Sequence, residues 1–224
     1  MSPLDSEMSM RSDQMRSDLI ALGQKMLASG LVTGTWGNVS CRLDDDHMLI
    51  TPSGMDYDTL THEDICLVEL ASSKALGMRT PSVESRLHRE IYLQRPAIGW
   101  IIHSHSRFAC TVASARKPIP AILDDLAQLV GGPVPIAPYA LPGTQELVDS
   151  CASALGASNA VLLANHGAVC LGRTAKEAFT TCEIVEKGAF AYLLSQLIGG
   201  AVPLSDEHVA TMRDFFVNKY GQRS

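Results

Sequence analysis

The sequence predicts one α/β domain, layered α/β/α, in which helices cover both faces of a mixed, mainly antiparallel central sheet. Apolar runs of strand length alternate with helical patterns along the chain, which is typical of an α/β protein. Several consecutive strands are joined too closely for crossover helices, so antiparallel pairing is expected between them. The chain has 224 residues, 46% of them hydrophobic, and lacks internal repeats and low-complexity linkers. We therefore expect a single large core.

The N-terminal part divides into a terminus and a first helix. Residues 1–16 are polar, rich in Met and Ser and without a sustained period, so we expect a loose terminus there, followed by the domain at 17–224. Apolar positions at helical spacing predict a core-facing helix from about residue 17, and Gly30 supplies its stop. A segment rich in Gly, Thr, Asn and Ser then leads from Leu31 to Arg42.

The remaining elements follow in chain order from apolar periodicity and capping residues. Strands are expected at 48–50, 65–68, 99–104, in the Pro-rich edge segment 132–138, at 161–165 and at 169–172. Helices are expected from Ser82 to before Pro96, at 107–115, at 121–130, from Thr144 to Leu155, from Thr174 to about Gly199 and from Ser205 to Tyr220. The interleaving gives the layered α/β/α arrangement.

Composition excludes several classes of function. A net charge of −6 and a pI near 5.6 argue against nucleic-acid or anionic membrane surfaces as partners. No apolar run is long enough to span a bilayer, and no charged-then-apolar leader opens the chain. Six cysteines are scattered without a Cys-x-x-Cys pair, which indicates reduced thiols and a cytoplasmic protein. Gly-rich nucleotide-binding loops are absent.

Two histidines end an apolar strand at Gly99-Trp100-Ile101-Ile102-His103-Ser104-His105. Because a strand alternates its side chains between two faces, His103 and His105 are expected on the same side, as two ligands for one metal. A third candidate, His166, ends the apolar run Val161-Leu162-Leu163-Ala164-Asn165 and precedes a glycine. Three neutral imidazoles leave positions open on Zn²⁺, as in a catalytic site. Taken singly, each histidine also fits a structural role.

A carboxylate, Glu84, is a further candidate site residue, at the start of the helix predicted before Pro96. With Ser82 as an N-cap, Glu84 is expected in the first turn of a helix, where the helix dipole favours a negative charge. By itself this position is equally suited to an ordinary dipole-complementing Glu. His88, one turn later on the same face, is expected to pack or to orient its neighbours.

These stretches together resemble the class II aldolase/adducin family, and within it the aldolases that act on L-fuculose 1-phosphate. The resemblance runs from about Leu19 to Tyr220, and its motifs come in the family's order. They are Gly34-Thr35-Trp36-Gly37-Asn38-Val39-Ser40, Ile50-Thr51-Pro52-Ser53-Gly54, the Glu84 helix, the His-x-His strand and Asn165-His166-Gly167. The resemblance implies a layered α/β fold with zinc on His103, His105 and His166, Glu84 as the acid/base, and a homotetramer with sites at subunit boundaries.

The resemblance also assigns a phosphate site and a second proton-transfer group. It implies that the substrate phosphate binds at Gly37, Asn38, Ser53, Gly54 and Ser82. From composition alone, a helix-to-strand turn is the simpler explanation of residues 31–42. One position departs from the family, because Val83 replaces a second serine. Tyr220 matches a tail tyrosine that reaches into a neighbouring subunit's site, and Asp124 stands where the family has another tyrosine.

The implied reaction is cleavage of a ketose 1-phosphate into dihydroxyacetone phosphate and an aldehyde, with Zn²⁺, Mn²⁺ or Co²⁺ as the metal. Aldolases for 5-deoxyribulose or 5-methylthioribulose 1-phosphate share these parts and remain alternatives. The related L-ribulose 5-phosphate 4-epimerases carry Asp at the position of Glu84, and the decarboxylase branch lacks the Glu. Adducin-like heads use the fold as a non-catalytic interaction module, and would be expected to have lost the histidines. Asp124 is expected to face the aldehyde end of the substrate, or else to complement the dipole of its own helix.

Overall fold

The computed structural model describes residues 3–221, and side chains from residue 10 onward. Its centre is an eight-stranded sheet in the order β4-β3-β2-β1-β5-β8-β7-β6. Every neighbouring pair is antiparallel except β6 and β7, so the predicted mixed, mainly antiparallel sheet is confirmed. The strands are β1 (Asn38–Arg42), β2 (His47–Ile50), β3 (Cys66–Glu69), β4 (Ala75–Leu76), β5 (Trp100–Ser104), β6 (Ile136–Ala137), β7 (Ala160–Leu163) and β8 (Gly167–Gly172).

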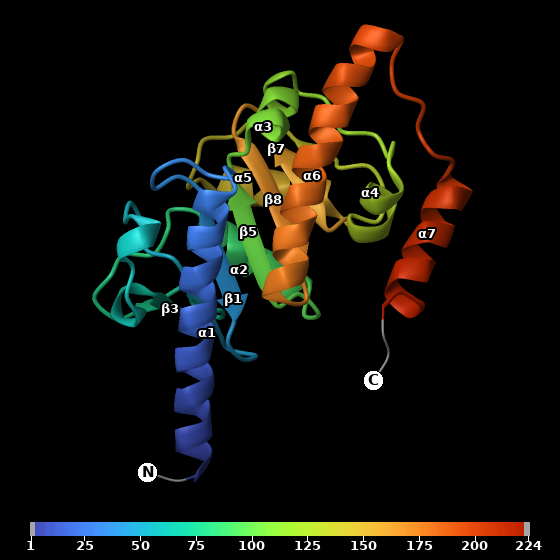
Figure 1. Cartoon of the computed structure of the whole chain (residues 1–224). Coiled ribbons are helices and arrows are strands. Elements are labelled where there is room, and N and C mark those ends of the chain that lie inside the picture. Colours follow the sequence, from blue (N-terminus) through green and yellow to red (C-terminus); the bar gives the residue numbers. More distant parts are fainter. Residues whose placement is uncertain (1–2, 222–224) are drawn as a thin grey trace.

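Helices form a layer on each face of this sheet (Figure 1). One layer contains α1 (Pro3–Ala28), α3 (Arg107–Ser114) and α6 (Ala175–Ser195), and the other contains α2 (Ser85–Gln94) and α5 (Gln145–Leu155). Short 3₁₀ turns are η1 (Tyr57–Thr59), η2 (His62–Asp64) and η3 (Gln196–Ile198). Two further helices lie at the periphery, where α4 (Asp124–Leu129) packs on α6 and α7 (Asp206–Asn218) packs on α4. Within the described residues no helix has the length and apolar character needed to cross a membrane.

The two faces of the sheet bury two separate apolar clusters. Because alternate residues of a strand point to opposite faces, Val39 and Ile102 join the cluster beneath α1 and α6. Ile101 joins the cluster beneath α2 and α5. His103 follows Ile101 by two residues and therefore lies on the α2 face of the sheet. Because of this alternation, α2 is the helix that can contact the side chain of His103.

Three of the predicted helix starts are confirmed by their caps. The side chains of Thr144, Thr174 and Ser205 accept backbone N–H groups in the first turns of α5, α6 and α7. These bonds satisfy donors that a helix start leaves unpaired. The sequence signals for these starts are therefore local and independent of the tertiary fold.

The predictions of two helix starts differ from the structure. The helix α1 begins at Pro3, so residues 3–16 are helical where a loose terminus was expected. Arg16, at the end of this segment, donates from Nη1 to the carbonyls of His62 and Ile65 at 2.7 and 2.6 Å, contacts that periodicity cannot reveal. Glu84 is the N-cap residue of α2 and not a first-turn residue. Ser82 lies before the helix and accepts the backbone N–H of Glu84 at 3.3 Å.

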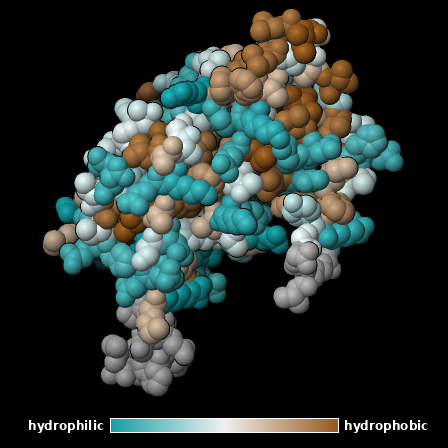
Figure 2. All heavy atoms as spheres, viewed as in Figure 1, coloured by the Kyte–Doolittle hydropathy of each residue, from teal (hydrophilic) through white to brown (hydrophobic). Residues whose placement is uncertain are grey.

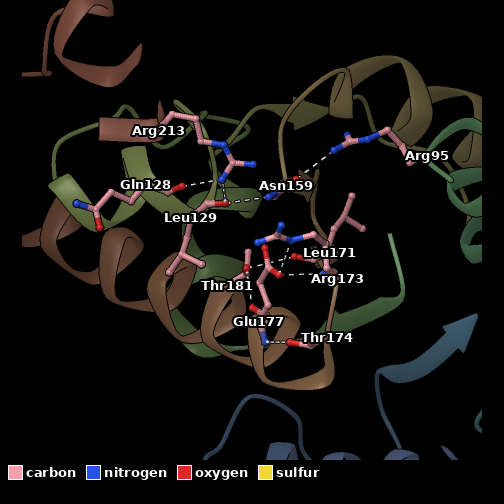
Figure 3. A network of polar contacts seen from close by, with 10 residues as sticks. All are labelled: Arg95, Gln128, Leu129, Asn159, Leu171, Arg173, Thr174, Glu177, Thr181 and Arg213. Carbon is pink, nitrogen blue, oxygen red and sulfur yellow. Dashed lines mark hydrogen bonds and ion pairs between the residues drawn. The ribbon is translucent and has the colours of Figure 1, made fainter. Parts of the chain in front are cut away.

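A polar network holds α7 against the body of the protein (Figure 3). Arg213 of α7 donates from Nη1 to the carbonyls of Gln128 and Leu129, at 2.6 and 3.0 Å. The buried Asn159 donates to the same Leu129 carbonyl and accepts from Arg95. A guanidinium at the last carbonyls of α4 satisfies acceptors that a helix end leaves unpaired. The C-terminal helix is thus attached chiefly at the end of α4.

Candidate metal centre and pocket

Three histidines converge where β5 ends beside the β7–β8 turn. Ligand nitrogens of His103, His105 and His166 all lie within 4.8 Å of one another. His103 is in β5, His105 follows that strand, and His166 precedes β8, which pairs with β5. The close approach requires Gly167, since a Cβ there would lie 2.3 Å from the carbonyl oxygen of Ser104. The antiparallel pairing of two strands therefore brings the predicted histidines together.

All three imidazoles are neutral. Burial lowers the pKa of His103 to about 4, that of His105 to about 3 and that of His166 to about 4. His103 donates from Nδ1 to the carbonyl of Ala168 at 3.1 Å, which leaves the lone pair of its Nε2 toward the other histidines. The Nε2 atoms of His103 and His105 are 2.8 Å apart. Neutral imidazoles with converging nitrogens are the donor set that Zn²⁺ and similar ions take.

Glu84 faces this set from the start of α2. Its Oε2 lies 3.2 Å from Nε2 of His103 and its Oε1 lies 3.4 Å from Nε2 of His166. Asn38 donates from Nδ2 to Oε2 at 2.8 Å, whereas the buried Oε1 has no hydrogen-bond partner. This carboxylate is only 6% exposed, and within residues 10–221 it makes no ion pair with a Lys or Arg side chain. A divalent cation on the histidines fits this deficit.

The register of α2 against β1 explains why Glu84 reaches the histidines. Asn38 and Ser40 lie on one face of β1, and Glu84 and His88 are one turn apart along α2. Asn38 therefore meets Glu84, and the Oγ of Ser40 lies 2.7 Å from Nδ1 of His88. Tyr92, one turn further, places its hydroxyl 2.9 Å from the same Oγ. The sequence analysis missed the contacts of Ser40 and Tyr92. Their positions carried a signal, because Ser40 is two residues after Asn38 on a strand and Tyr92 is four residues after His88 on a helix.

A cavity of about 270 Å³ opens beside the three histidines and Glu84. It is lined by all five residues predicted to bind phosphate, namely Gly37, Asn38, Ser53, Gly54 and Ser82. The backbone N–H groups of Gly37 and Gly54 make no hydrogen bond within the described part of the chain. Both glycines have left-handed φ angles, +76° and +68°, which favour a residue without a Cβ. The cavity therefore combines unpaired donors with the carboxylate and the imidazoles.

Several residues of the cavity were not predicted from the sequence. Trp36, Val83 and Pro142 line it together with Thr35 and Pro52. Lone apolar residues in loops carry no periodic signal, so only their position next to predicted site residues pointed to them. No Lys or Arg of the described residues lines the cavity.

Asp124 and Tyr220 do not reach this cavity within one chain. Asp124 is the first residue of α4 and is exposed, and Tyr220 follows α7 with 63% of its surface exposed. Neither residue lines the cavity. Proton transfer by Tyr220 and contact of Asp124 with the substrate would therefore require a second copy of the chain. Both roles stay predictions.

Comparisons with known proteins identify relatives over nearly the whole chain. The model of the Class II Aldolase and Adducin N-terminal domain matches residues 17–193. The 5-deoxy-D-ribulose 1-phosphate aldolase of Bacillus thuringiensis serovar kurstaki is 34% identical over 93% of this chain and 97% of its own. An L-fuculose phosphate aldolase of Escherichia coli O6:H1 is 36% identical over 96% of this chain and 99% of its own. A solved L-fuculose 1-phosphate aldolase superposes with a TM-score of 0.87 at 35% identity, covering 91% of this chain and 96% of that one.

Proposed function

This chain belongs to the class II aldolase and adducin family, and we propose that it is a metal-dependent aldehyde-lyase that cleaves a ketose 1-phosphate into dihydroxyacetone phosphate and an aldehyde. The observation that carries this proposal is the buried Glu84 carboxylate, whose oxygens lie 3.2 and 3.4 Å from the nitrogens of two neutral histidines. An interaction module would have no need to bury an unbalanced carboxylate against three imidazoles. This favours the enzyme over the adducin-like alternative.

His103, His105 and His166 would hold the metal, as Zn²⁺, Mn²⁺ or Co²⁺. When bound, the cation would polarise the ketone and stabilise the negative charge that develops as the carbon–carbon bond breaks. The carbonyl of Ala168 keeps the proton of His103 on Nδ1 and so keeps its Nε2 available as a ligand. A similar partner for Nδ1 of His166 is absent among the described residues.

Glu84 would transfer a proton at the carbon that loses the aldehyde. In cleavage it returns a proton to that carbon, and in synthesis it removes the proton. Asn38 holds Oε2 by a 2.8 Å hydrogen bond, which orients the carboxylate and leaves Oε1 free for the substrate. The distance of 3.4 Å from Oε1 to Nε2 of His166 supports this assignment, because it brings the oxygen next to the proposed metal ligands.

The phosphate would bind through Gly37, Asn38, Ser53, Gly54 and Ser82, which line the same cavity as Glu84. Unpaired backbone N–H groups at Gly37 and Gly54 support this assignment. A Cβ at Gly37 would lie 2.6 Å from the carbonyl oxygen of His103, so the phosphate loop is packed directly against the histidine strand. Val83 adds no hydroxyl at this site, and its side chain lines the cavity instead.

A second group must take the proton of the hydroxyl that becomes the aldehyde. We propose Tyr220 of a neighbouring subunit for this step, with Asp124 beside it at the aldehyde end. An assembly with sites between subunits is supported by the apolar surface at the end of α6 and on the segment that follows (Figure 2). Leu194, Leu197, Ile198 and Val202 are exposed there. A homotetramer is the proposed form.

The proposed location is the cytoplasm. All six cysteines are free, and five of them are buried. Burial raises the pKa of Cys66 to about 11 and that of Cys151 to about 12, so these thiols stay protonated and inert. Unpaired thiols are typical of a reducing compartment.

The proposal is tested by a screen of ketose 1-phosphates and 5-phosphates with detection of dihydroxyacetone phosphate. L-Fuculose 1-phosphate and the 1-phosphates of 5-deoxyribulose and 5-methylthioribulose are the first candidates, since relatives named for each of these substrates were found. Release of dihydroxyacetone phosphate from any of them supports the aldolase. Epimerisation of L-ribulose 5-phosphate without cleavage would indicate the epimerase, and no turnover of any sugar phosphate by metal-loaded protein would favour the interaction module.

A further inference from the structure

Beyond the contact of Asn38 with Glu84, a row of buried polar contacts continues between β1 and α2. The Oγ of Ser40 lies 2.7 Å from Nδ1 of His88 and 2.9 Å from the hydroxyl oxygen of Tyr92. These three residues are at most 1% exposed, and none of them lines the cavity. Burying polar groups costs stability unless they bond to one another, so a polar network in place of apolar side chains needs an explanation.

The spacing of these contacts matches the repeats of a strand and a helix. Asn38 and Ser40 are two residues apart on β1, which is about 6.7 Å along a strand. Glu84 and His88 are four residues apart on α2, which is about 6 Å along a helix. Because the two steps nearly agree, Asn38 can bond to Glu84 while Ser40 contacts His88. A slide of α2 along its axis would break both contacts.

Apolar packing alone would not fix the position of α2. Leu87 and Ile91 are buried in the apolar cluster on this face of the sheet. Hydrophobic burial is non-directional, whereas a hydrogen bond has a narrow range of distance and angle. At the far end of the row, Arg42 donates to the carbonyl of Tyr92, and its Cζ lies 4.9 Å from the centre of the Tyr92 ring. The polar contacts therefore determine where α2 lies along β1.

The carboxylate of Glu84 depends directly on that position, because Glu84 is the N-cap residue of α2. Its carbonyl accepts the backbone N–H groups of Leu87 and His88 at 2.9 and 3.2 Å, so its backbone moves with the helix. Its Oε2 accepts from Asn38, and its Oε1 has no partner among the described residues. The start of the helix therefore sets where Oε1 lies.

His88 and Tyr92 are unsuited to proton transfer with a substrate. Burial lowers the pKa of His88 to about 3, so its imidazole is neutral, and burial raises the pKa of Tyr92 well above its usual value. Nε2 of His88 is buried without a hydrogen-bond partner among the described residues. Since neither side chain lines the cavity, an effect of either on the reaction has to pass through Glu84.

We propose that Ser40, His88 and Tyr92 are positioning residues for catalysis, which fix α2 along β1 so that the carboxylate of Glu84 lies at the reacting carbon. This inference rests on the proposed aldolase function and adds these three residues to it. Misplacing a catalytic group by about 1 Å can cost about a hundredfold in rate. Metal and phosphate are proposed to bind other residues, so their binding should persist when the network is broken.

The test measures kcat and KM separately, on a ketose 1-phosphate that the wild type cleaves. Ser40→Ala removes both contacts with the loss of one oxygen atom, and should lower kcat by roughly tenfold to a hundredfold with little change in KM, metal content or affinity for dihydroxyacetone phosphate. His88→Leu should have a similar effect. His88→Asn keeps a hydrogen-bonding atom near the place of Nδ1 and should regain part of kcat.

Thr181→Val is the matched control, because Thr181 is equally buried and its hydroxyl joins α6 to the carbonyl of Leu171 in β8. It should lower the melting temperature about as much as Ser40→Ala does, with wild-type kcat. If Ser40→Ala also keeps wild-type kcat, the network is only structural and the proposal is wrong, while the aldolase stands. Tyr92→Phe, which removes one hydroxyl, gives the same comparison if Ser40→Ala does not fold.

Coupling to Glu84 separates positioning from other effects. In a Glu84→Gln background, with turnover measured at high enzyme concentration, Ser40→Ala should cause no further loss, since the group that it positions is already absent. An equal loss in both backgrounds would show that Ser40 acts by another route, and would overturn the proposal. If the wild type neither cleaves nor forms any ketose phosphate, the aldolase fails and the positioning role fails with it.

Hydrogen exchange gives a readout that does not depend on turnover. The backbone N–H groups of Leu87 and His88, which bond to the carbonyl of Glu84, should exchange faster in Ser40→Ala than in the wild type. Those of α5, which belongs to the same helix layer, should be unchanged. Equal exchange at the start of α2 in both proteins would show that apolar packing suffices to hold the helix, and would contradict the proposal.

Discussion

The pocket and the C-terminal helix differ in how they are held. His103 is 1% exposed and Glu84 is 6% exposed, and each is fixed by hydrogen bonds from a neighbouring strand. In contrast, α7 contains no buried residue and is attached at the end of α4 through Arg213. A single chain therefore brings the three histidines and Glu84 together, whereas Tyr220 is exposed and does not line their cavity. The proposed role of Tyr220 needs a second copy of the chain.

This contrast predicts where substitutions act. Changes in the pocket should abolish chemistry while the fold persists, because two large apolar clusters elsewhere stabilise it. Changes at α4 and α7 should alter rate or selectivity while the metal and the phosphate still bind.

His105→Ala should bind less than one metal ion per chain and lose turnover by at least about a thousandfold, since its imidazole is one of three converging ligands. The melting temperature should change little, because His105 is partly exposed and outside both apolar clusters. Elemental analysis and a lyase assay measure both effects. His62→Ala is the control, as His62 lies in a distant 3₁₀ turn. Full activity of His105→Ala, or of protein stripped by a chelator, contradicts the metal centre.

Glu84→Gln should lower kcat by about 10² to 10⁴-fold while metal content and phosphate affinity persist, since the amide keeps the size but cannot accept the proton. Glu90→Gln on the same helix is the control, because Glu90 contacts only Gln94 and Arg89. Metal content, product affinity and kcat are measured for both variants. A rise in KM with kcat retained would make Glu84 a binding residue.

The sequence predicted the pocket better than it predicted the edges of the elements. The convergence of His103 and His166 follows from one local fact, that each histidine lies at or just after the end of an apolar strand, and from the long-range antiparallel pairing of β5 with β8. The helix start at Thr144 follows from a side-chain cap. By comparison, α1 begins at Pro3 where no sustained period predicted a helix, and Arg16 in this segment bonds carbonyls 46 and 49 residues away. Tertiary contacts of this kind leave no periodic trace.

The same reasoning explains what was missed inside the pocket. Trp36, Val83 and Pro142 are exposed apolar residues in loops, and such residues are usually unremarkable. Their significance comes from the cavity that brings them together. The roles of Asp124 and Tyr220 depend on a second chain, and no pattern within one chain specifies how two copies meet.

Tyr220→Phe should lower kcat by roughly 10²-fold, the lower limit for loss of a general acid or base, with little change in the melting temperature. The residue is exposed, and its ring lies against the rings of Phe215 and Phe216. Tyr139→Phe is the matched control, because Tyr139 is also exposed and does not line the cavity. Mixed assemblies of Tyr220→Phe and Glu84→Gln chains should regain activity, since some sites then receive both intact groups. No recovery, with mixing verified by mass, would contradict donation between subunits.

Arg213→Gln should weaken the attachment of α7 to α4. Because Tyr220 follows α7, this substitution should also lower kcat, by less than Tyr220→Phe does. The substitution removes donors to the carbonyls of Gln128 and Leu129, and charged hydrogen bonds of this kind are worth about 1.5–3 kcal/mol. Arg213 is half-buried and its charge also complements the end of α4, so Arg213→Lys should restore part of the attachment. Hydrogen exchange of α7 should rise while that of β5 stays unchanged. Equal protection of α7 in wild type and Arg213→Gln would show that the apolar contacts with α4 suffice.

The smallest expected effect is at Asp124. We predict that Asp124→Asn and Asp124→Tyr change the relative rates on L-fuculose 1-phosphate and the 1-phosphates of 5-deoxyribulose and 5-methylthioribulose by severalfold, with little change in stability. The alternative is a carboxylate that only complements the dipole of α4, which is worth about 0.3–1 kcal/mol. Asp206 is the matched control, since it is also an exposed first-turn carboxylate, in α7. If Asp124→Asn and Asp206→Asn lose similar stability and neither changes the substrate ratios, Asp124 belongs to its own helix and not to a neighbour's site.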